Sequence, residues 1–322
     1  MPAMNLRPTI PALSLLAAVI LISVPESAVA AQTAAQSAAG QSYETPEAAV
    51  IALIEAVKND KLDAMRTVLG PGSDTLLNSG DRYSDSAERT RFLAAYDERH
   101  EIMAAAPGRM TLRVGNDNWP LPLPLVRTDG RWRFDAQAGA QELINRRIGR
   151  NEIAAIRTAL AYVDAQKIFF VMTGHNGIAQ YARHLLSSPG KYDGLYWPAT
   201  EDEPKSPLEP LVAQAREEGY PVDTGAAGPR PYHGYHFRIL TAQGTNSPKG
   251  ARSYIDNGRM TKGFALAAWP ASYGISGIMC FIVNQDEIVF QKDLGPHTAA
   301  ITSAMTLFDP DLSWAQIDIV QQ

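Results

Sequence analysis

The sequence predicts an α+β protein, in which helices and antiparallel strands occupy separate stretches of the chain. Apolar residues recur at helical spacing in 45–58 and 151–172, whereas 234–294 alternates β-branched and aromatic runs with turn residues. We therefore expect two parts. An N-terminal module of helices and antiparallel sheet should occupy 43–148, and a long helix packed on an antiparallel meander should occupy 149–322.

The composition is typical of a globular protein. The 322 residues suffice for one large domain or two ordinary ones, and 45% of them are hydrophobic and 20% charged. The formal net charge is only -5 and no basic cluster is interleaved with aromatic residues, so nucleic acid is not an expected partner. The single cysteine, Cys280, lies in an apolar run and is expected to be a buried, inert side chain.

Residues 1–30 have the features of a signal peptide. Arg7 is the basic residue of its first part, and the apolar run 12–24 is shorter than the ~20 residues that span a membrane. The small residues at Ala28–Ala30 predict cleavage after Ala30, with Ala31 as second choice. The alternative is an uncleaved membrane anchor.

The mature chain is expected to be periplasmic or secreted. No cysteine lies near the cleavage point, so we expect neither a lipid anchor nor any other membrane anchor after cleavage. Residues 31–42 are rich in Ala, Gln, Ser and Gly, which is typical of a disordered leader.

The N-terminal module is expected to begin with three helices. Thr45 is a capping residue and Pro46 suits a first helical position, which predicts a helix to about Lys58. Apolar spacing predicts a second helix at 62–69 and a third at Ser86–Ala105.

Three strands should follow, because the period of the apolar residues changes to two. They are expected at Met110–Val114, Leu121–Thr128 and Arg131–Phe134, with a type I′ hairpin at Asp129-Gly130 between the last two. This element order is similar to that of the cystatin and nuclear-transport-factor-like cone, as an analogy of element order alone.

The C-terminal domain is expected to start with its longest helix, Asn151–Met172. Asn151 is a suitable N-cap, an upstream start at Gln141 is the alternative, and Gly174 should end the helix. Its length of about 33 Å would cross a whole sheet. The apolar stripe expected to face that sheet comprises Ile153, Ile156, Leu160, Val163 and Phe170.

A proline-rich excursion, Ser187–Tyr232, separates this helix from the meander. We expect it to be ordered and to contain a helix at Leu208–Glu218, with a flexible linker as the alternative. A last short helix should occupy Thr298–Phe308. The meander strands are expected at Tyr235–Ala242, Phe264–Trp269, Ile275–Val283 and Ile288–Phe290.

Aromatic residues of the excursion are the first candidates for ligand binding. Tyr192, Tyr196 and Trp197, with Tyr232 and Tyr235 later, lie beside Gly and Pro, and such rings line glycan or peptide grooves in some proteins. The alternative is that these rings clamp the excursion onto its own domain.

Three histidines are the second group of candidates. Two of His175, His233 and His236 within hydrogen-bond reach of Asp or Glu in one pocket would indicate a hydrolase or glycan-processing enzyme. The histidine spacings do not match a zinc site, and no nucleophile or nucleotide-binding motif is present. We therefore expect no metal, no cofactor and no catalytic residue.

Five stretches carry a resemblance to a known family: TPEAAVIALIEAVKNDKLDAMRTVLGP, VGNDNWPLPLPLVRTDGRWRFD, QELINRRIGRNEIAAIRTALAYVDAQ, GYHFRILTAQG and GFALAAWPASYGISGIMCFIVNQDEIVFQKDLG. They resemble the exported bacterial family named domain of unknown function 2950, a name that implies no activity. The C-terminal half is also similar to the globular heads of type IV pilins and pseudopilins. It lacks the hydrophobic N-terminal helix that those proteins join to the head.

Together these features favour a non-catalytic envelope protein that binds or scaffolds another envelope protein or a glycan. The rival interpretations are the hydrolase that uses His and carboxylate groups and a structural homo-oligomer.

Overall fold

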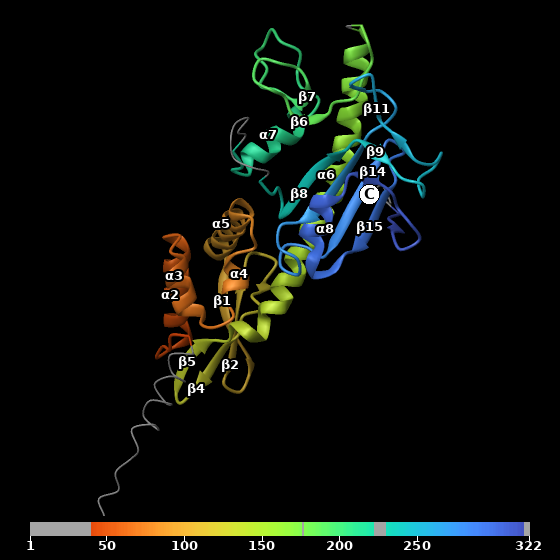
Figure 1. Ribbon diagram of the computed structural model, residues 1–322. Helices are drawn as coiled ribbons and strands as arrows, with labels where there is room; N and C mark the ends of the chain where they lie inside the picture. The colour runs from red at the N-terminus through yellow and green to blue at the C-terminus, as the bar shows by residue number, and fades with distance from the viewer. Residues whose placement is uncertain (1–39, 176, 222–229, 319–322) are drawn as a thin grey trace, which may run out of the picture. The chain divides into compact units, whose positions relative to one another are not determined.

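Helices and antiparallel sheets are segregated along the chain, and the α+β class is confirmed (Figure 1). The computed structural model describes residues 40–175, 177–221 and 230–318. The predicted signal peptide, its cleavage point and residues 31–39 of the predicted leader lie outside the described residues. The described residues belong to one compact unit that begins at Gly40.

The first part of this unit packs four helices against an antiparallel sheet with the order β1-β2-β4-β5, in which β3 pairs with β2. The helices are α2 (Pro46–Lys58), α3 (Leu62–Leu69), α4 (Asp74–Leu77) and α5 (Arg82–Glu98). The strands are β1 (His100–Ala106), β2 (Arg109–Val114), β3 (Trp119–Pro120), β4 (Leu125–Thr128) and β5 (Arg131–Phe134).

Two local predictions for this part are confirmed. The Oγ1 of Thr45 accepts a hydrogen bond from the backbone N–H of Ala48 at 3.1 Å, and Pro46 is the first residue of α2. Asp129 and Gly130 have φ angles of 51° and 80°, as a type I′ turn requires, and join β4 to β5.

The predicted third helix, Ser86–Ala105, is wrong at its C-terminal end. Helix α5 ends at Glu98, and His100–Ala106 forms strand β1. Ile102 in β1 pairs with Leu112 in β2. Tertiary pairing with β2 therefore outweighs the helical preference of the alanine-rich segment.

Helix α6 (Ala136–His175) is the longest element, with 40 residues, and connects the two predicted parts. It begins upstream of Gln141, so residues 148 and 149, where we divided the chain, both lie inside it. Asn151 is not an N-cap, because it lies in the helix interior and its Nδ2 donates to the backbone carbonyl of Ser276 at 2.8 Å. Among the described helices none combines the length and the hydropathy needed to cross a membrane.

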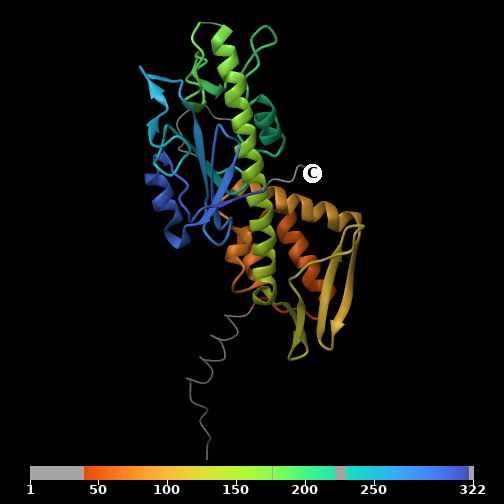
Figure 2. The ribbon, with the colours of Figure 1, turned by 90° about the vertical axis from the view of Figure 1, so that its right-hand side faces the viewer.

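The second part is a meander with the order β17-β15-β14-β13-β8, in which every neighbouring pair is antiparallel. Its strands are β8 (Tyr235–Leu240), β13 (Ala265–Pro270), β14 (Met279–Asn284), β15 (Val289–Asp293) and β17 (Ala315–Gln316). Figure 2 shows α6 lying across the sheet, in contact with β13 and β14. Helix α8 (Thr298–Ala304), whose predicted end at Phe308 is four residues too late, packs against β13.

The face that α6 turns to the sheet includes most of the predicted stripe, since Val163 is buried and Ile156 and Leu160 pack against the core. Ile153 is 52% exposed, whereas Ala155, Ala159, Tyr162 and Gln166 are buried. Small alanines allow the helix to approach the sheet closely, and Tyr162 donates its hydroxyl proton to the carbonyl of Ala265 at 3.2 Å. Hydrophobicity alone wrongly included Ile153 and missed the alanines and the polar residues with buried partners that complete this face.

Short elements complete the fold. The parallel pair β6 (His184–Leu186) and β7 (Gly194–Tyr196) and helix α7 (Glu209–Glu217) order the described part of the excursion. The predicted strand Ile275–Val283 begins only at Met279, because backbone hydrogen bonds from Ile275 and Ser276 to Ser272 form a turn. The remaining elements are β9 (Ala242–Gln243), β10 (Arg252–Ser253), β11 (Ile255–Asp256), β12 (Arg259–Met260), β16 (Leu307–Phe308) and the 3₁₀ turn Gly295–His297.

Candidate functional site

The first part of the chain is not completely filled by its own side chains. Helices α2 to α5, the sheet and the start of α6 line a partly open cavity of about 420 Å³, which we call the apolar cavity. Its volume falls in the range of roughly 300–1,000 Å³ that is typical of small-molecule sites. Its apolar lining consists of Leu53, Val57, Met65, Leu69, Leu76, Leu77, Phe92, Ala95, Val114, Trp119, Leu121, Leu123 and Leu143.

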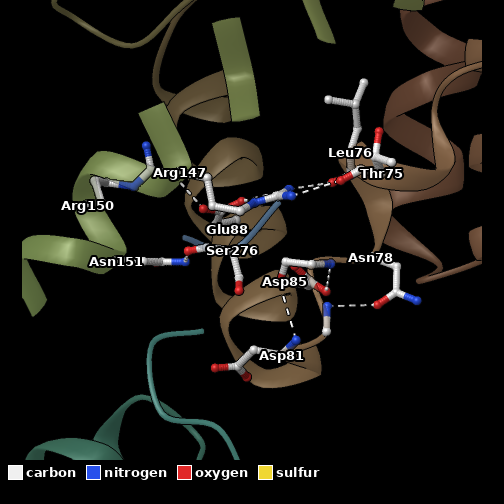
Figure 3. A network of polar contacts seen from close by, with 12 residues as sticks. Thr75, Leu76, Asn78, Asp81, Asp85, Glu88, Arg147, Arg150, Asn151 and Ser276 are labelled. Atoms are coloured by element: carbon white, nitrogen blue, oxygen red, sulfur yellow. Dashed lines mark hydrogen bonds and ion pairs between the residues drawn. The ribbon is translucent and has the colours of Figure 1, made fainter. Parts of the chain in front are cut away.

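Two buried charged residues, Arg147 and Asp85, also line the apolar cavity (Figure 3). The guanidinium of Arg147 donates to the carbonyls of Thr75 and Leu76 at 2.9 and 2.5 Å. One carboxyl oxygen of Asp85 accepts from the backbone N–H of Ser79 at 3.0 Å. Within the described part of the chain, Arg147 Nε and Asp85 Oδ1 have no hydrogen-bond partner.

These two atoms leave unmet hydrogen-bonding capacity at the cavity. Arg147 is 4% and Asp85 6% exposed, and an unpaired buried polar atom costs about 1–3 kcal/mol. Burial also raises the pKa of Asp85 above its ordinary value, because desolvation penalises the carboxylate more than the neutral acid. A mostly apolar cavity with a few such polar atoms is the usual composition of a small-molecule site.

A second cavity, of about 400 Å³, adjoins the first, and we call it the arginine cavity. Glu88, Arg91 and Arg150 line both cavities. Helix α5 turns one face, with Ser84, Ala87, Glu88 and Arg91 at helical spacing, to the arginine cavity. Its other lining residues are Asn151, Ile153, Ala154 and Arg157 of α6, with Glu218, Tyr220 and His233.

The charges of the arginine cavity are only partly balanced. Glu88 forms ion pairs with Arg150 and, at 3.6 Å, with Arg147 (Figure 3). Glu218 lies 3.0 Å from the Nε2 of His233. No ion pair among the described residues involves Arg91 or Arg157. The cavity therefore carries excess positive charge.

Asp81 fixes the wall that holds His233. Its carboxylate caps α5 through the N–H groups of Tyr83 and Ser84, and also accepts from the Tyr220 hydroxyl at 2.8 Å and the N–H of Gly234 at 2.9 Å. Burial is the main cause that lowers the pKa of His233, against the opposing effect of Glu218. The four accepted hydrogen bonds give this wall a defined geometry.

Comparison with known proteins identifies the family. The family described as protein of unknown function (DUF2950) matches residues 40–317. The chain belongs to this family. No curated protein and no solved structure shows significant similarity to it. The family membership confirms the first resemblance, and the similarity to pilin heads stays a prediction.

The aromatic candidates lie elsewhere than in these cavities. Tyr196 and Trp197 are 1% and 3% exposed and belong to the core beneath the meander. The Nε1 of Trp197 donates to the carbonyl of Pro204 at 2.9 Å, and the ring of Tyr192, which is exposed, packs on Trp197. This arrangement matches the alternative in which the rings clamp the excursion onto its own domain.

The remaining candidates are dispersed. His233 lines the arginine cavity, and the ring of Tyr232 packs beside it with centroids 4.2 Å apart. His236 packs against Trp269 in the meander, and His175 is exposed at the end of α6. Burial raises the pKa of Cys280 to about 11, so this thiol is neutral at physiological pH.

The residues that form the two cavities were not predicted from the sequence. Charged residues on helices usually form solvated faces, so nothing in the sequence distinguished Glu88, Arg91, Arg147, Arg150 or Arg157. The helical spacing of Glu88 and Arg91 on α5 was visible in the sequence. The sequence did not show that residues of α5 and α6 line the same cavity. No group of three His, Cys, Asp or Glu that could hold a metal ion is found in the described ranges.

Proposed function

We propose that this protein is a non-catalytic cell-envelope protein that binds a small molecule in the apolar cavity of its N-terminal module. The observation that carries the proposal is an apolar cavity of about 420 Å³ with unpaired buried polar atoms on Arg147 and Asp85. A ligand that excludes water from the leucine-rich wall gains hydrophobic free energy. Its polar atoms can satisfy the two unpaired groups.

The cell-envelope location rests on the predicted signal peptide. The proposed ligand site also replaces the aromatic groove as the favoured binding region, since Tyr196 and Trp197 are core residues. A hydrolase is less favoured. It would need two histidines within hydrogen-bond reach of Asp or Glu in one pocket, and His233 with Glu218 provides one such contact. No contact among the described residues favours the homo-oligomer over the binding role.

A neutral apolar fluorophore tests the proposal. N-phenyl-1-naphthylamine should bind the mature chain saturably with one-to-one stoichiometry and gain fluorescence. Ala95→Leu, which places a larger side chain in the apolar cavity, should weaken binding at least tenfold. Ala300→Leu, at an exposed position of α8, is the matched control and should bind like the unmodified chain. Absence of saturable binding, or equal weakening by both variants, would contradict the proposed function.

A further inference from the structure

The arginine cavity points to the chemical class of the ligand, an inference that rests on the proposed function. We infer that the two adjoining cavities take one amphipathic anion, with its apolar tail in the apolar cavity and its carboxylate or phosphate head in the arginine cavity.

The contiguity of the cavities is the first argument. Glu88, Arg91 and Arg150 line both, so the side chains of these residues lie at the boundary between the two cavities. Arginines line both cavities, since Arg89, Arg146 and Arg147 also line the apolar cavity, but leucine side chains line the apolar cavity alone. This distribution of apolar side chains matches a molecule whose apolar end lies in the apolar cavity.

The charge balance is the second argument. Glu88 already has cationic partners, since it forms ion pairs with Arg147 and Arg150, whereas Glu218 faces His233, whose lowered pKa favours the neutral imidazole. Arg91 and Arg157 add two positive charges without an ion pair in the described part of the chain. Guanidinium groups bind carboxylate and phosphate through paired N–H donors.

The orientation of the ligand follows from the charged residues that line the two cavities. Asp85 lines the apolar cavity, and its carboxylate form would repel an anionic head placed there. In the arginine cavity Glu88 is paired with Arg147 and Arg150, and Arg91 and Arg157 outnumber the one remaining carboxylate, Glu218. The head should therefore lie beside Arg91 and Arg157 and the tail beside Leu121 and Phe92.

Three ligands with the same ten-carbon tail test this inference: decanoate, decyl phosphate and neutral decan-1-ol. Displacement of N-phenyl-1-naphthylamine gives their relative affinities. At least one anion should bind about tenfold tighter than the alcohol, as expected for one charge-assisted contact. The anion that binds tighter identifies the head group.

The double variant Arg91→Gln/Arg157→Gln should lose that advantage while it binds the alcohol like the unmodified chain. Arg259→Gln, at an exposed position of β12, is the matched control and should still bind the anion more tightly than the alcohol. Either single variant, with an expected loss of about threefold, serves if the double variant does not fold. Equal affinity for the anions and the alcohol in the unmodified chain would overturn the inference. Because the neutral fluorophore still binds in that case, the proposed function would survive; if the fluorophore does not bind, both fail.

Discussion

The core beneath the meander is closed by aromatic rings, whereas the core of the N-terminal module surrounds a cavity. In the former, Tyr162 packs edge-on against Phe264 with centroids 5.7 Å apart, and Tyr235 packs on Phe281 at 5.8 Å. The hydroxyls of both tyrosines donate to strand carbonyls. In the latter, Asp85 and Arg147 remain partly unpaired at the wall.

This difference separates a scaffold from a binding region. Close packing of buried aromatic rings makes the meander core intolerant of volume changes. The N-terminal module gives up part of that packing around its cavity, which reduces its stability. Such a loss is common where a protein keeps a site for function.

The largest expected effect is the loss of stability when a phenylalanine of either core is truncated to alanine. Phe281→Ala should reduce the free energy of unfolding by about 3–5 kcal/mol, because the ring is 1% exposed and fully packed. Phe92→Ala should cost clearly less, because part of its ring already faces an empty cavity. Urea denaturation of both variants measures the difference, and similar losses would show that the cores do not differ in packing.

An intermediate effect comes from added volume. Ala159→Leu, in the buried face of α6, should reduce stability by about 1–3 kcal/mol through overpacking. Ala95→Leu, at the wall of the apolar cavity, should leave the midpoint of urea unfolding unchanged or raise it, because the added methyl groups enter existing space. A larger loss for Ala95→Leu than for Ala159→Leu would contradict the comparison.

The smallest expected effect concerns the buried acid. The pKa of Asp85 is raised in the folded state, so its stabilising contribution is complete below the unfolded pKa of ~3.9 and is lost as pH rises. Asp85→Asn keeps an oxygen acceptor without the charge. It should therefore raise Tm near pH 7, with a gain that shrinks as the pH falls toward 4.

Thermal unfolding measured across this pH range checks the sign. Asp117→Asn, at an exposed position, is the control and should change Tm little at any pH. A gain for Asp85→Asn that grows as the pH falls would mean that the folded protein holds Asp85 as a stabilised carboxylate.

Local features of the sequence were sufficient to predict the positions of several helices and strands. Thr45-Pro46 placed the start of α2, Asp129-Gly130 specified the hairpin, and the alternating runs located β8, β13, β14 and β15 to within a few residues. These features depend on one residue's hydrogen bonds or backbone preference, or on a short-range pattern. The sequence therefore contains what is needed to predict them.

The structural predictions that were wrong have a common physical cause. Strand β1 exists because β2 supplies its hydrogen-bond partners, and Ala155 and Ala159 join the buried face of α6 because small side chains allow close approach to the sheet. Asn151 was expected to cap a helix, but Ser276, far along the chain, satisfies its amide inside α6. Each outcome depends on a partner that is distant in sequence.

The sequence by itself determined the α+β class, the family and the meander of strands around Cys280. Only the tertiary structure decided that Tyr196 and Trp197 are core residues and that α5 and α6 bring Glu88, Arg91 and Arg150 to the boundary of two cavities. The reason is that a cavity is a space which several elements leave between them. No single segment encodes it, because its volume and charge depend on how distant helices and strands pack together.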